Sequence, residues 1–182
     1  MNKLLLLLFA ILFFSCKTKE SKPAFSEKVV SYNYEVSDQP KNRKNPYSVL
    51  FNLEKNTSDT YTIVTDVFLS QGAHFISPSS KEDFKGKFKI IIPENDNITV
   101  DKNLIETPKS HEEFDPHPFV AGFVNWVRVN TTYKQKMTLK TNKDFTVSGT
   151  VEFVVEPNCT LEKVPFTIKQ EKGWLVMYGD GC

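Results

Sequence analysis

The strongest constraint in this sequence is a hydrophobic period of two residues, which recurs along most of the chain. From Phe145 to Val155, apolar or small residues occupy every second position, and polar residues fill most positions between them. A strand with one buried face shows this alternation, because successive side chains point to opposite faces of a sheet. The same period is present at residues 30–36, 47–53, 61–69, 88–92, 133–139, 164–168 and 174–178. We therefore predict β-strands at all of these positions.

Short turn signals separate these runs. Clusters containing Pro, Asn, Asp or Gly stand at residues 39–40, 45–46, 56–59, 93–97 and 172–173, and these residues favour tight turns. No window longer than ten residues has the apolar spacing of an amphipathic helix. The 182 residues are 40% hydrophobic, which is enough for one core. The expected fold is all-β, an antiparallel sandwich of roughly eight to ten short strands.

The first residues have the pattern of a secretory signal. Lys3 precedes an apolar run from Leu4 to Phe14, which as a helix extends only ~16 Å, against a hydrocarbon core of about 30 Å. Ser15 followed by Cys16 resembles the lipobox of bacterial lipoproteins, in which the cysteine is lipidated and becomes the mature N-terminus. The alternative is an ordinary cleavable signal in which Cys16 is incidental.

The lipoprotein interpretation divides the chain into three parts. Residues 1–15 are then the signal peptide, residues 16–27 the lipidated cysteine with a polar tether, and residues 28–182 one folded domain. We expect the lipid to hold the protein at a membrane of the bacterial cell envelope, facing the periplasm or the surface.

The charge of the chain argues against nucleic acid as a partner. There are 23 Lys and Arg against 22 Asp and Glu. Removing the leader, which contains Lys3 alone, leaves 22 against 22. A neutral domain has no long-range field that would gather phosphates.

Two segments stand out from the strand-and-turn background. One is PKSHEEFDPHPF at residues 108–119, and the other is FTVSGTVEFVVEPNC at residues 145–159, with GAHF upstream at residues 72–75. In this order they resemble the N-terminal periplasmic domain of the thiol:disulfide interchange protein DsbD. The resemblance implies an immunoglobulin-like β-sandwich that receives electrons from a membrane-embedded transporter and passes them to periplasmic thiol proteins.

The resemblance also implies a redox site and a cap over it. In the family, two cysteines on neighbouring strands alternate between dithiol and disulfide, and a thiolate of low pKa attacks the partner disulfide. A short cap loop with a Phe and acidic residues shields the pair. The run His111, Glu112, Glu113 and Phe114 matches this cap, with Phe114 as the lid, and Cys159 matches one of the two cysteines.

The sequence departs from the family pattern at the second cysteine. That position falls within residues 153–156, none of which carries sulfur. One cysteine cannot cycle as an intramolecular dithiol, so any enzymatic activity is at most thiol:disulfide interchange through Cys159. The family's electron conduit does not follow this domain, so we expect any electrons to be collected in trans. The expected partners are periplasmic thioredoxin-like or other envelope proteins.

The remaining cysteines leave three alternatives open. With Cys16 lipidated, Cys159 and Cys182 remain in an oxidising compartment. They can form one structural disulfide, which the chain-entropy model values at roughly 3 kcal/mol. Cys182 can instead replace the missing redox partner of Cys159, or the two thiols can be independent.

Other candidate sites have simpler explanations. The side chains between His111 and His117 are expected to diverge on a solvated loop, so neither a metal nor another cofactor is expected. His74 is expected at a strand edge. The aromatic residues Phe119, Phe123, Trp126 and Tyr133 are expected in the core.

Three functions compete on these observations. The first is a lipid-anchored module of a thiol-disulfide pathway, acting through Cys159 with a degenerate redox site. The second is a non-catalytic immunoglobulin-like module that binds proteins of the cell envelope. The third, which has less support, is a purely structural envelope lipoprotein.

Overall fold

The computed structural model describes residues 32–34, 45–118 and 120–179. Within these residues every regular element is a β-strand, and no helix is long and apolar enough to cross a membrane. The predicted signal peptide, Cys16, the tether and Cys182 lie outside the described residues, so the predictions made for them stay predictions.

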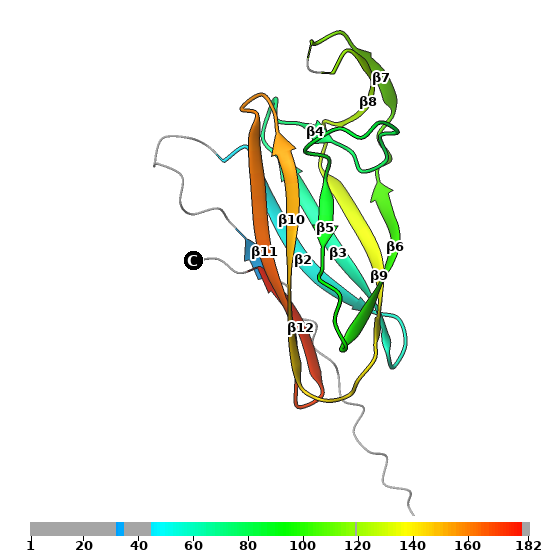
Figure 1. Cartoon of the computed structure of the whole chain (residues 1–182). Coiled ribbons are helices and arrows are strands. Elements are labelled where there is room, and N and C mark those ends of the chain that lie inside the picture. Colours follow the sequence, from blue (N-terminus) through cyan, green and yellow to red (C-terminus); the bar gives the residue numbers. More distant parts are fainter. Residues whose placement is uncertain (1–31, 35–44, 119, 180–182) are drawn as a thin grey trace, which may run out of the picture.

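The strands form two large antiparallel sheets and one small one (Figure 1). The first sheet has the order β1 (Tyr32–Tyr34), β2 (Tyr47–Lys55), β3 (Thr60–Leu69), β9 (Thr131–Leu139) and β6 (Ile98–Thr107). The second has the order β12 (Trp174–Gly179), β11 (Thr160–Glu171), β10 (Phe145–Val155) and β5 (Lys89–Ile91). The small sheet has the order β4 (Phe75–Ile76), β8 (Gly122–Val127) and β7 (Glu112–Asp115).

The core lies between the two large sheets. On β10 every second residue is buried from Phe145 to Val155, as the alternation predicts. Aromatic rings meet across the sandwich: Phe51 of β2 lies 5.0 Å from Phe166 of β11, centroid to centroid. Phe88 stacks on Tyr133 of β9 with 4.0 Å between ring centroids. Because every regular element described is a β-strand and the two sheets pack face to face, the all-β prediction is confirmed. The architecture is an immunoglobulin-like sandwich.

Gly149 provides the space for one of these rings. It lies in the middle of β10, opposite Phe166 of β11. A Cβ atom on Gly149 would lie 2.2 Å from the Cζ atom of Phe166. The Phe166 ring is fully buried, so it occupies the volume that a side chain at residue 149 would need.

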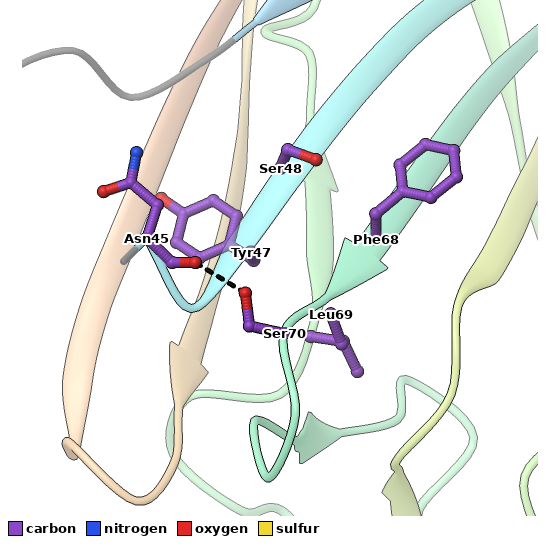
Figure 2. A pocket seen from close by; sticks show the side chains of 6 residues that line it. All are labelled: Asn45, Tyr47, Ser48, Phe68, Leu69 and Ser70. Carbon is purple, nitrogen blue, oxygen red and sulfur yellow. Dashed lines mark hydrogen bonds between the residues drawn. The ribbon is translucent and has the colours of Figure 1, made fainter. Parts of the chain in front are cut away.

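A shallow hollow of about 230 Å³ marks the end of the sandwich where β2 begins and β3 ends. Figure 2 shows the Ser70 hydroxyl donating a hydrogen bond to the carbonyl oxygen of Asn45, at 2.7 Å. The Tyr47 hydroxyl in the same hollow donates to Glu162 of β11 at 2.9 Å. These bonds fasten the start of β2 to β3 and to the facing sheet.

Some expectations about strands and core differ from the structure. The sequence predictions omitted β6, because a register shift between Val100 and Leu104 breaks its period of two, and most of its side chains are exposed. Phe123 was expected in the core, but its side chain is 56% exposed. Phe119 lies outside the described residues, and Tyr133 is fully buried as expected.

Candidate functional site

Cys159 lies in the turn between β10 and β11, at one end of the sandwich. Val155 and Thr160 form the last pair of the two strands, so residues 156–159 make a four-residue turn. Cys159 has a positive φ of 53°, a left-handed conformation that is uncommon outside glycine. Its side chain is exposed and its thiol is free. The turn therefore presents the sulfur atom to solvent.

Glu156 opposes ionisation of this thiol. Its carboxylate repels the thiolate charge and hydrogen-bonds the thiol, which together raise the pKa of Cys159 above its ordinary value. The nucleophile in disulfide exchange is the thiolate, which usually forms beside cations or at helix N-termini. In the conformation described for this turn, Glu156 therefore acts against the low-pKa thiolate that the family resemblance implies.

Glu156 is held in place by backbone pairing with His74. The two residues form a β-bridge in which each N–H donates to the other's carbonyl oxygen, at 3.2 and 2.9 Å. The His74 ring nitrogen Nδ1 lies 3.0 Å from the carbonyl oxygen of Gly72. The ring also meets the edge of Trp126, 4.8 Å away. His74 thus lies at a strand edge, as expected, and supports the wall beside Cys159.

The expected cap is a strand of a hairpin. Glu112, Glu113 and Phe114 belong to β7, which pairs with β8, while His111 is exposed just before it. Phe114 lies opposite Phe123 in the register, and their rings meet edge to face at 5.5 Å between centroids. Phe114 is 60% exposed.

Asp115, the next residue, is turned to the opposite face of β7. Its carboxylate accepts hydrogen bonds from the Trp126 indole at 3.0 Å and from the His117 backbone N–H at 2.8 Å. The His117 bond is the main reason that the pKa of Asp115 lies below its ordinary value. The side chains of this hairpin that border Cys159 come from the Asp115 face, so the shielding role expected of Phe114 stays a prediction.

Glu106 of β6 attaches this hairpin to the sandwich. Its carboxylate accepts hydrogen bonds from the Ser77 hydroxyl at 2.6 Å and the Tyr133 hydroxyl at 2.9 Å. It also accepts one from the backbone N–H of Ser110, just before β7, at 2.7 Å. Burial and the Glu106 charge raise the pKa of Tyr133 far above its ordinary value, so its phenol remains a hydrogen-bond donor.

Two adjoining hollows open beside Cys159. One, of about 530 Å³, is bordered by Ile76, Trp126, Val154, Leu161 and the loop at residues 83–86. The other, of about 500 Å³, is bordered by His74, Asp115, His117 and Pro157. Val120, Trp126, Glu156 and Cys159 line both. We call the combined depression the Cys159 groove.

Residues 153–156, where the resemblance would place a second cysteine, include the end of β10 at Val155. Phe153 and Val155 are fully buried, and Val154 is partly buried beside the groove. Within the described part of the chain, Cys159 is the free cysteine. No three His, Cys, Asp or Glu side chains of these residues are arranged to hold a metal ion.

A disulfide between Cys159 and Cys182 stays a prediction. The pairing register of β12 determines how far the chain after Gly179 must reach to form it. Gly179, the last residue of β12, lies opposite Phe166, six residues from Thr160 at the start of β11. Six residues of strand span about 20 Å, whereas the three residues after Gly179 reach at most ~11 Å. A disulfide needs Cα atoms within about 7 Å. The bond would therefore require the end of β12 to separate from β11.

Replacing Glu156 by glutamine should lower the pKa of Cys159, because the repelling carboxylate is removed. At neutral pH a larger fraction of the thiol would be ionised, and alkylation by iodoacetamide would become several-fold faster. The rate is measured against pH by mass spectrometry of the peptide that contains Cys159. Glu152→Gln is the matched control, because that carboxylate pairs with Lys163 at 3.1 Å instead. An unchanged pH profile in Glu156→Gln would contradict the role of Glu156.

Sequence reasoning missed the part that Trp126, Asp115 and Leu161 play in this groove. Trp126 was expected in the core, but it is only partly buried and lines the groove. Leu161 is 55% exposed at the start of β11. The sequence signal was weak, because these residues come together only through the docking of the β7–β8 hairpin beside the β10–β11 turn.

Comparisons with known proteins show that the fold of this chain is similar to that of solved structures. No family model and no curated protein matches this chain. The structure is similar to the N-terminal periplasmic domain of ScsB from Proteus mirabilis, with 14% identity and a TM-score of 0.51. That match covers 76% of this chain and 50% of the other, so the chain spans about half the length of its relative.

Two yeast domains are also similar at lower scores. The GAE domain of GGA2p from Saccharomyces cerevisiae has 11% identity and a TM-score of 0.41, covering 78% of this chain and 98% of the other. The yeast GGA1 GAE domain has 9% identity and a TM-score of 0.40, covering 79% and 100%. What these comparisons establish, through the ScsB domain, is that the fold of this chain is similar to that of about half of a known periplasmic N-terminal domain.

Proposed function

We propose that this protein is a lipid-anchored binding module of the bacterial cell envelope, related to the N-terminal domain of DsbD. It docks a thioredoxin-like or other envelope protein at the Cys159 end of the sandwich, and it does not cycle through an intramolecular dithiol. The environment of Cys159 carries this proposal. A thiol beside the Glu156 carboxylate has a raised pKa, and the segment where the family has its second cysteine supplies Phe153 and Val155 to the core instead.

Three further observations support the envelope assignment. The sequence segments described above resemble a periplasmic N-terminal domain, and the fold is similar to another protein's periplasmic N-terminal domain. The lipobox-like sequence before Cys16 would place the domain at a membrane surface.

A redox function through a mixed disulfide is the second candidate. It is favoured by the free, exposed thiol of Cys159. In this mechanism the thiolate of Cys159 attacks one sulfur of the partner's disulfide. A mixed disulfide forms, and the other partner sulfur leaves as a thiolate.

Cys159→Ser separates the two functions. We expect the wild type and this variant to bind a purified periplasmic thioredoxin-like protein with affinities within about threefold of each other, because serine differs from cysteine by one atom. We also expect neither form to reduce the partner's disulfide. Binding is measured by calorimetry and reduction by thiol titration. A mixed disulfide trapped at Cys159, together with partner reduction that the variant loses, would support the redox function instead.

A further inference from the structure

The Cys159 groove has an apolar section that remains open to solvent. Leu161 is 55% exposed although it lies in a paired strand, and Trp126 and Val154 are only partly buried. The Trp126 indole N–H is bonded to Asp115, and the Arg128 guanidinium lies 5.6 Å from the ring centroid, so the indole offers the groove only the part of its apolar ring that these partners leave uncovered. Covering this section with an apolar side chain would remove hydrophobic surface from water, which is favourable.

The rim of the groove carries an excess of negative charge. Asp83, Asp115 and Glu156 line it, against Lys85. Arg128 lies close to Asp115 and Trp126, but it forms an ion pair with Glu113 at 2.8 Å. The pKa of Asp115 is lowered, so this carboxylate is ionised at neutral pH. The chain as a whole is balanced, with 23 Lys and Arg against 22 Asp and Glu. The acidity is therefore a local property of the groove, and it favours a cationic ligand.

The backbone beside the groove is already paired. The Val154 N–H donates to the Gly86 carbonyl at 2.9 Å, and Glu156 pairs with His74 in both directions. A residue with a side chain cannot replace Gly86, because the backbone there has a φ of +84° and an added Cβ atom would lie 2.3 Å from the Val154 side chain. On this side of β10 the backbone therefore has no open edge for a ligand to extend among the described residues, and recognition there must come from the ligand's side chains.

We propose that the Cys159 groove binds an exposed segment of a partner protein in which lysine or arginine flanks a large apolar side chain. This inference rests on the proposed docking function and identifies the chemistry of the docked segment. The apolar side chain covers Trp126 and Leu161, and the flanking cations face Glu156 and Asp115.

The test uses the full chain and three fluorescein-labelled hexapeptides. The first has lysines on both sides of a central Leu–Phe pair, the second has glutamates in place of the lysines, and the third has alanines in place of the central pair. Fluorescence anisotropy should show saturable binding of the first peptide and affinities at least ~10-fold weaker for the other two. Added salt should weaken binding of the first peptide, because the rim charges are exposed.

Two variants locate the binding site. Leu161→Ser should weaken binding of the first peptide about fivefold, since it removes apolar surface that the ligand covers. Ile105→Ser is the matched control, because Ile105 is also 55% exposed but lies on β6, and it should leave binding unchanged. Glu156→Gln should weaken binding, whereas Glu54→Gln, which removes a surface carboxylate on β2, should not.

The outcomes separate this inference from the proposed function. If the first peptide shows no saturable binding up to about 1 mM, or if Leu161→Ser and Ile105→Ser behave alike, the inference is overturned. In either case the thioredoxin-like protein can still bind the wild type, and the proposed docking function then stands without this ligand chemistry. Loss of both bindings would overturn both.

Discussion

A valine at residue 149 should destabilise the protein by about 3 kcal/mol, which corresponds to a fall in melting temperature of roughly 6–12 °C. The Cβ of any side chain at this position would lie 2.2 Å from the Phe166 ring. That ring is fully buried and packs against Phe51 at 5.0 Å, so it cannot move without displacing the facing sheet. Close-packed interiors absorb added methyl groups poorly for this reason.

The measurement is thermal and urea unfolding of the Gly149→Val variant followed by circular dichroism. Gly122→Ala is the matched control, because a Cβ at Gly122 would have its nearest neighbours at 3.5 Å, an ordinary contact distance. We expect that control to change stability by less than about 0.5 kcal/mol. Equal effects of the two substitutions would show that Gly149 does not provide the space for Phe166.

Removing the Glu106 carboxylate should destabilise the protein by a similar amount, because buried hydrogen-bond donors would lose their acceptor. Glu106→Ala leaves the fully buried Tyr133 hydroxyl, the Ser77 hydroxyl and the Ser110 N–H without their acceptor. An unsatisfied buried donor costs about 1–3 kcal/mol. We therefore expect a loss of about 3 kcal/mol in the free energy of unfolding, together with faster hydrogen exchange at Ser110, where the chain enters the β7–β8 hairpin.

A double substitution tests the reason for this loss. In Glu106→Ala with Tyr133→Phe, the phenol donor is removed along with its acceptor, so part of the lost stability should return. The ring stack on Phe88 is retained in this variant. Glu54→Ala is the control for losing a carboxylate, because its exposed ion pair with Lys134 contributes at most about 1 kcal/mol. Strictly additive effects of the two substitutions would contradict the proposed coupling between Glu106 and Tyr133.

The strands that the sequence predicted correctly are those with one buried face. From Phe145 to Val155 the alternation and the burial agree residue by residue, because the period of two is a direct consequence of burying one side of a sheet. The predictions failed where that cause is missing. Strand β6 is largely exposed and bulged, and β7 has mostly exposed side chains, so no hydrophobic period marks either of them.

The candidate site was predictable only in part. The resemblance pointed to Cys159 and to a cap at residues 111–114 from short stretches of sequence, and the functional roles of these residues stay predictions. Neither the resemblance nor the hydrophobic pattern could show that Glu156 would raise the pKa of Cys159, because that effect depends on how the β10–β11 turn folds. The sequence also could not show which face of β7 borders the groove, because a register shift of one residue would put Phe114 in the place of Asp115.

The amino-acid sequence by itself determined the all-β class, the positions of most core strands and the absence of a cysteine from residues 153–156. These follow from local periodicity and from residue identity, which do not depend on distant contacts. Only the tertiary structure decided that residues separated by many positions, such as His74, Trp126 and Glu156, would form one groove around Cys159. That arrangement depends on the register between strands and on the docking of the hairpin, and both are set by long-range packing.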